Sequence, residues 1–219
     1  MDTIIRFFQE GGAFMVPIAI IMAIGLAISL ERFFFLLKEK SGNRSAFDEL
    51  LPMLQKRDLR SALNYANSSN THIGNIFAAG IARIPGSQRR EEIEYALEEG
   101  LMEAIPQLEK RTQYVATLAN IATLMGLLGT IMGLIAAFTA VANAAPAEKA
   151  TLLSQSISVA MNTTAFGLIA AIPLLLMHSY LQTKTSEIVD SIEMAGVKFL
   201  NIITERKAGQ NDTPGNNGQ

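Results

Sequence analysis

The chain has 219 residues, of which 49% are hydrophobic and 17% are charged, and its formal net charge at pH 7 is -2. The charges are crowded into particular segments, which is typical of a small integral membrane protein. The lack of cysteine excludes disulfides and thiolate chemistry. The chain has no hydrolase, P-loop or dinucleotide-binding motif, so we do not expect an enzyme. It also has no basic cluster interleaved with aromatic residues, so we do not expect a nucleic-acid-binding protein.

The first predicted element is a membrane-spanning helix over residues 13–37, preceded by a short periplasmic segment, 1–12. Residues 11–30 carry no charge, and about 20 apolar residues of helix cross the hydrocarbon core of a bilayer. The stretch lacks the small-residue cleavage pattern of a removable signal peptide. We therefore expect this helix to anchor the chain in the membrane.

The next segment, 38–111, is predicted to be a helical cytoplasmic domain. Its apolar residues recur at helical spacing in 47–66 and in 91–111, which predicts two amphipathic helices. The second of these carries an acidic face, which we interpret as a solvated surface, with a docking site as the alternative. The acidic face consists of Glu91, Glu92, Glu94, Glu98, Glu99 and Glu103.

A second membrane-spanning helix is predicted over residues 112–142. Small side chains share one face of this helix, and such faces let helix backbones approach closely in a membrane. The face consists of Gly126, Gly129, Gly133, Ala136, Ala137 and Ala140. Thr130 lies at its margin, where its hydroxyl either bonds to its own helix or faces a neighbour.

A short periplasmic link, 143–150, leads to a third spanning helix, 151–182, and the two helices are expected to form an antiparallel hairpin. Residues 150–183 carry no charge, yet eight residues ahead of the apolar run 167–177 have hydroxyl or amide side chains. Lipid does not favour so many polar groups, so one side should face protein or water. Asn162, Thr163 and Thr164 favour a pore, with interhelical hydrogen bonding as the alternative.

The distribution of Lys and Arg predicts the orientation, because cytoplasmic segments retain positive charge. Residues 38–111 hold eleven Lys and Arg, and four more follow residue 183. The N-terminus should therefore be periplasmic and the C-terminus cytoplasmic, in the inner membrane of a bacterial cell. A cytoplasmic helix over 183–207 and a disordered tail, 208–219, complete the predicted elements.

No predicted span contains an acidic residue within its apolar part. An ion carrier usually needs an ionisable group within the apolar core of the membrane. Either the chain is not a transporter, or a partner subunit supplies the acid. His72 and His178 are too separated in sequence to suggest a metal site, and we expect no cofactor apart from a transported ion.

Three stretches of the chain strongly resemble the MotA/TolQ/ExbB family, in its three-span ExbB/TolQ branch. They read EGGAFMVPIAIIMAIGLAISLERF, LANIATLMGLLGTIMGLIAAF and SISVAMNTTAFGLIAAIPLLL. The resemblance implies a homopentamer around two helices of a single-span ExbD/TolR-like subunit, whose membrane Asp is the missing acid. It further implies transfer of work to a TonB- or TolA-like protein.

The resemblance also assigns roles to individual residues. By motif position, Thr130 and Thr164 match family threonines that face the partner's Asp, and Pro173 matches a proline of the third span. Gly126, Gly129, Gly133 and Gly167 are expected to serve helix packing in the membrane.

One departure from the family concerns ion choice. Many relatives carry Glu in the frame G-I-A-E-A, where this chain has Val159, so a proton relay through that Glu is not carried over. Asn162 and Thr163 add polar groups beside Thr164, which makes a Na⁺ site at Thr130, Asn162, Thr163 and Thr164 a rival to H⁺ coupling. A non-conducting membrane scaffold is the alternative function.

Overall fold

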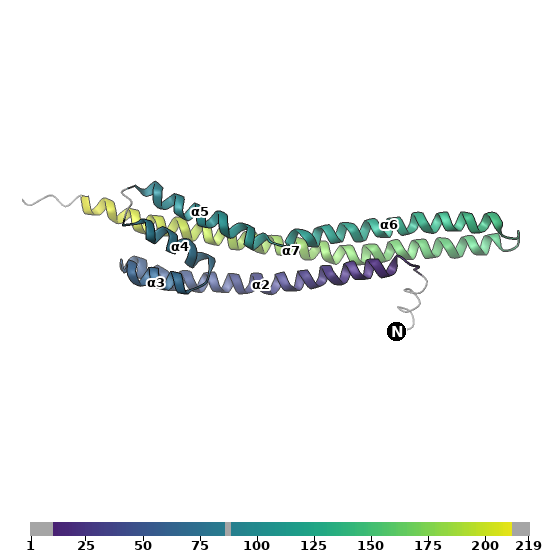
Figure 1. Cartoon of the computed structure of the whole chain (residues 1–219), viewed down its shortest axis with the longest axis horizontal. Coiled ribbons are helices and arrows are strands. Elements are labelled where there is room, and N and C mark those ends of the chain that lie inside the picture. The colour runs from purple at the N-terminus through teal and green to yellow at the C-terminus, as the bar shows by residue number, and fades with distance from the viewer. Residues whose placement is uncertain (1–10, 86–88, 212–219) are drawn as a thin grey trace, which may run out of the picture. The chain divides into compact units, whose positions relative to one another are not determined.

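A computed structural model describes residues 11–85 and 89–211 of the chain, with side chains described as far as Thr204. Within these residues every regular element is a helix, which confirms the all-α prediction for this part of the chain (Figure 1). Residues 1–10 and 212–219, which include parts of the predicted periplasmic segment and tail, lie outside the described residues. The helices are α2 (Met15–Gln55), α3 (Leu59–Ser68), α4 (His72–Arg83), α5 (Arg90–Glu109), α6 (Thr112–Asn143) and α7 (Lys149–Asn211).

Two helices run further than the sequence pattern predicts. The helix expected to end near Leu37 continues to Gln55. The span predicted over 151–182 is continuous with the helix predicted over 183–207 and runs on to Asn211, so residues 208–211 of the predicted disordered tail are helical. The continuation of α2 includes Gly42 and Pro52, which cost about 1 and about 3 kcal/mol relative to Ala in a helix interior. Once a helix has formed, each added residue gains a backbone hydrogen bond without a new nucleation cost.

The chain divides into two units, which we describe separately. Unit 1 comprises Met1–Phe33 and Arg111–Gln182, and unit 2 comprises Phe34–Lys110 and Thr183–Gln219. Helices α2 and α7 each contribute to both units.

Unit 1 is built from the first part of α2, from α6 and from the first part of α7, and α6 and α7 lie side by side in it (Figure 1). Small and aliphatic side chains fill its interior. One cluster of buried side chains consists of Met15, Ile18, Val115, Ala119, Ala122, Phe166, Ala170, Ala171 and Leu174. With so many alanines between them, the helices can pack closely.

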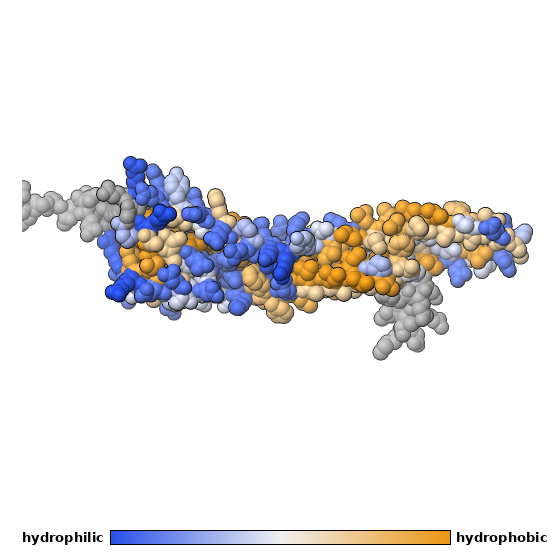
Figure 2. Space-filling model, in the orientation of Figure 1, coloured by the Kyte–Doolittle hydropathy of each residue, from blue (hydrophilic) through white to orange (hydrophobic). Residues whose placement is uncertain are grey.

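Large apolar side chains cover the outside of unit 1. Leu124, Phe138 and Leu176 are 62%, 66% and 68% exposed, and Figure 2 shows apolar surface gathered over this part of the chain. Segments of α2, α6 and α7 are each long and apolar enough to cross a membrane. Soluble proteins rarely expose such a continuous apolar surface, whereas hydrocarbon covers it without cost. The fold is therefore that of an integral membrane protein with three candidate spans.

A sharp break separates α5 from α6. Arg111 has a φ of 67°, in the left-handed region, which costs a non-glycine residue about 1–2 kcal/mol. Its guanidinium donates to the Glu31 carboxylate at 3.2 Å, and the Nδ1 of His178 lies 3.1 Å from the carbonyl oxygen of Thr112. These two contacts attach the first residues of α6 to α2 and α7 and offset the strained backbone.

Unit 2 packs the remaining helices around aromatic side chains. The rings of Phe77 and Phe199 have centroids 4.9 Å apart, and Phe47 meets Phe77 edge-on at 6.2 Å. The Oδ1 of Asn43 accepts a hydrogen bond from the backbone N–H of Ile73 at 3.1 Å, which attaches α2 to the start of α4. Phe77 thus links the second part of α2 to α7 through α4.

We predict that Phe199→Ala destabilises unit 2 by about 3–5 kcal/mol, because it leaves a cavity beside Phe77 at a site with no solvent exposure. Urea unfolding of the detergent-solubilised protein, followed by circular dichroism, measures this loss. Met194→Ala, on the same helix but 60% exposed, should change stability by less than about 0.5 kcal/mol. Equal effects of the two substitutions would contradict the packing described here.

Candidate ion pathway

Helices α6 and α7 approach each other most closely through glycines. A Cβ built on Gly167 would lie 2.8 Å from the carbonyl oxygen of Ala122 and 2.9 Å from the Cα of Gly126. A Cβ on Gly133 would lie 2.8 Å from that of Ala160, and one on Gly129 would overlap the side chain of Thr163. Glycine at these positions is therefore a steric requirement of the hairpin.

Thr164 bridges the two helices at this contact. Its hydroxyl donates to the carbonyl oxygen of Gly126 at 2.8 Å, 38 residues away in sequence. The side chain is half-buried. Because a hydroxyl has one proton but two lone pairs, Thr164 still offers an oxygen acceptor to any group that approaches from outside.

Thr163 lies inside the chain, only 2% exposed. Its hydroxyl lies 2.7 Å from the carbonyl oxygen of Gly11 and 2.9 Å from that of Val159. The side chain therefore joins α7 to the residues that precede α2 while packing against Gly129. The sequence pattern did not reveal this contact, because nothing in it connects residue 163 with residue 11.

Thr130 and Asn162, the other two predicted pathway residues, are both half-buried. The Thr130 hydroxyl donates to the Leu127 carbonyl oxygen of its own helix at 2.6 Å. The half-buried Asn162 side chain makes no hydrogen bond within the described part of the chain. The structure thus brings Thr163 and Thr164 to the helix contact and leaves the Asn162 amide free to bind another group.

A polar stripe on α7 faces away from the core of unit 1. It consists of Thr151, Ser154, Gln155, Ser158 and Asn162, of which the first four are exposed. The opposite face of α7 holds the buried Thr163, Gly167 and Ala170. Polar groups at membrane depth need cover from protein or water. One chain by itself leaves this stripe uncovered.

The resemblance to the family directs attention to two further positions. Val159 is half-buried, and its Cγ1 would lie 3.2 Å from a Cβ built on Gly12, so its apolar side chain packs against the residues before α2. Pro173 lies on the exposed face of α7, which stays helical through it. Proline has no N–H, so the carbonyl of Ile169 has lost its usual helical donor.

The apolar parts of the three spans contain no carboxylate, and no cluster of potential metal-binding side chains occurs among the described residues. Glu31, which follows the first apolar run, is paired with Arg111 at the start of α6. The four predicted pathway residues therefore supply hydroxyls and an amide. These groups can hydrogen-bond to an acid on another chain or bind a cation, but they do not themselves change charge.

Residues 68–194, more than half of the chain, match the MotA/TolQ/ExbB proton channel family. A biopolymer transport protein ExbB homolog of Methanothermobacter thermautotrophicus is 26% identical over 88% of this chain and 67% of its own length. The Tol-Pal system protein TolQ of Haemophilus influenzae is 34% identical over 46% of this chain and 42% of its own. The biopolymer transport protein ExbB of Aquifex aeolicus is 35% identical over 37% of this chain and 54% of its own.

We predict that Gly129→Leu destabilises the α6–α7 hairpin by about 1–3 kcal/mol or more, because the new side chain must displace Thr163. The melting temperature of the protein in detergent should fall accordingly. Ala136→Leu, at an exposed position two turns along the same helix, is the control and should change it little. A normal melting temperature for the Gly129 variant would mean that the glycines do not determine the packing.

Proposed function

Because the chain belongs to the MotA/TolQ/ExbB proton channel family, we propose that it is the channel subunit of an ExbBD/TolQR-like complex in a bacterial inner membrane. This complex would use the proton gradient to energise a periplasmic partner for transport or envelope work. The N-terminus would be periplasmic, and unit 2 and the C-terminus would be cytoplasmic, in line with the distribution of Lys and Arg.

The observation that carries this proposal is the uncovered polar stripe on α7. A non-conducting scaffold could use glycine contacts alone and gains nothing from exposed hydroxyls and amides in a membrane. A pathway for an ion needs such groups. It also needs an acid, and the apolar parts of the spans of this chain have none. A partner helix with a membrane Asp, packed against the stripe, would meet both needs.

The assembly that we propose is a homopentamer around the helices of a single-span ExbD/TolR-like subunit, with a TonB- or TolA-like protein as the recipient of the work. The exposed apolar surface of unit 1 would then be shared between neighbouring copies and lipid. Each copy would present the same polar stripe to the centre. A partner helix inside the ring would meet a similar site at each step of a rotation.

The hydroxyls favour one protonation state of the partner's acid. The protons of Thr164 and Thr130 are already donated to the carbonyl oxygens of Gly126 and Leu127. Both threonines therefore offer lone pairs, which stabilise a protonated carboxyl group and not a carboxylate. Asn162 can donate as well as accept, so it can also bind the charged form. Thr163 would position these groups through its contact with Gly11.

The same lone pairs could bind Na⁺, so Na⁺ is the alternative coupling ion. The test is ion flux through the protein and its single-span partner in liposomes, with a pH gradient or a Na⁺ gradient imposed separately. Flux driven by the pH gradient alone supports H⁺ coupling. Flux with Na⁺ alone would assign Thr130, Asn162 and Thr164 to a cation site. Absence of flux under both gradients would favour the scaffold.

We predict that Thr164→Val lowers proton flux by up to about tenfold, because it removes a hydroxyl whose hydrogen bond to the protonated acid is worth about 0.5–1.5 kcal/mol. Flux in the liposome assay measures the effect. Thr164→Ser keeps the hydroxyl and should restore most of the flux.

Thr139→Val is the matched control for this experiment. Like the Thr130 hydroxyl, the Thr139 hydroxyl donates within its own helix, to the carbonyl oxygen of Ile135 at 2.9 Å. By helical geometry, however, Thr139 lies on a different face of α6 from Thr130. Its flux should match that of the unmodified protein. Full flux through the Thr164→Val variant, with normal assembly, would remove Thr164 from the pathway.

A further inference from the structure

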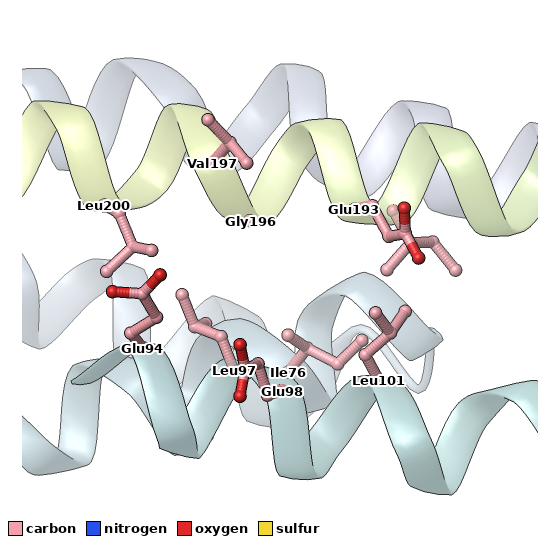
Figure 3. Close-up of a pocket in the computed structure, with 10 residues that line it drawn as sticks. Ile76, Glu94, Leu97, Glu98, Leu101, Glu193, Gly196, Val197 and Leu200 are labelled. Carbon is pink, nitrogen blue, oxygen red and sulfur yellow. The ribbon is translucent and has the colours of Figure 1, made fainter. Parts of the chain in front are cut away.

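Unit 2 contains a groove between α4, α5 and the last part of α7 (Figure 3), with a volume of about 280 Å³. Side chains from all three helices form its apolar walls. These side chains are Ile76, Leu97, Leu101, Ile192 and Leu200. Gly196 also lines the groove, and a Cβ built on it would meet no atom within 4 Å. The groove thus has open space above an aliphatic surface.

Three carboxylates also line this groove. Glu94 and Glu98 come from α5, and Glu193 comes from α7. Figure 3 shows Glu94 near Leu200 and Glu193 toward the other end of the groove. Glu94 lies 4.0 Å from Arg90 of its own helix, while Glu98 and Glu193 have no ion pair within the described part of the chain. Among the residues that the structure describes, no lysine or arginine lines the groove.

A solvated acidic face does not account for this arrangement. It describes α5 alone, where Glu91 and Glu92 are exposed outside the groove. The structure adds Glu193 from a distant part of the sequence to two of the α5 glutamates and places apolar side chains between them. A ligand that buries aliphatic groups here would also bring its own positive charges close to these carboxylates.

We propose that this groove binds a short cationic amphipathic helix of another protein. Aliphatic side chains spaced three and four residues apart would enter the apolar part, and flanking lysines or arginines would pair with Glu98 and Glu193. Helices bind to grooves in other proteins by this combination of anchors and flanking charges. The proposal does not depend on ion conduction by unit 1.

Binding of a designed peptide to the full-length protein in nanodiscs tests the proposal. The probe is a fluorescein-labelled helix of about 14 residues with leucines at helical spacing and lysines beside them, and fluorescence anisotropy gives its Kd. A second peptide has glutamate in place of each lysine. The lysine peptide should bind at least about tenfold more tightly than the glutamate peptide, after binding to empty nanodiscs is subtracted.

Substitutions place the binding in the groove. Gly196→Leu fills the open space, and Glu98→Lys reverses a lining charge, so each should raise the Kd about tenfold or more. Glu99→Lys is the matched control, because this adjacent exposed residue lies outside the groove. It should change the Kd less than about twofold. Circular dichroism confirms that each variant is folded.

Several outcomes would overturn the proposal. An unchanged Kd for Gly196→Leu would place the peptide elsewhere, and equal effects of Glu98→Lys and Glu99→Lys would indicate general charge attraction. Equal binding of the two peptides would indicate adhesion to an apolar surface. If Gly196→Leu instead changes the mass of the assembled protein, the groove is covered by a second copy of the chain.

Discussion

The close approach of α6 and α7 at Gly126 and Gly167 is the constraint on which the structure of the membrane unit depends. A Cβ built on Gly167 would lie only 2.9 Å from the Cα of Gly126. Because neither residue has a side chain, the two helices meet through their backbones. That contact brings the Thr164 hydroxyl to the Gly126 carbonyl oxygen. The packing of the hairpin and the chemistry of the proposed pathway therefore share one cause. The hydrogen bond from Thr164 to Gly126 joins the helices, and because it uses the hydroxyl proton, only the lone pairs of the Thr164 oxygen remain available.

The same contact determines which face of α7 is left outside. With Thr163, Gly167 and Ala170 buried, helical geometry turns Ser154, Ser158 and Asn162 away from the core. A chain in lipid by itself would expose these polar groups at a cost. The arrangement is favourable only if other protein or water covers the stripe, as the assembly that we propose would do.

Much of this fold could be predicted from the sequence, because its main signals are local. Long uncharged runs predict the spans, and the glycine spacing predicts a smooth face on α6. The extent of α2 could not be predicted in this way, since polar residues such as Lys38 are compatible with both a loop and an exposed helix. For α7 the sequence predicts helix as far as residue 207, but not that this helix is continuous with the span before it. The burial of Thr163 was also hidden, because it depends on the residues before α2. Likewise, only the tertiary structure brings Glu193 to Glu98.

In the mechanism that we propose, Val159 bears on how the parts are divided between chains. At the position where the family resemblance leads us to expect Glu, this chain packs an aliphatic side chain beside Gly12, in surroundings that would disfavour a charged carboxylate. In that mechanism, a charge that changes during ion transfer would come from the partner subunit. The threonines would act as fixed dipoles, because their O–H groups are hydrogen-bonded to the carbonyl oxygens of Gly126 and Leu127. These groups do not titrate and would favour the neutral acid over the charged one, and this difference would couple protonation of the partner to its position.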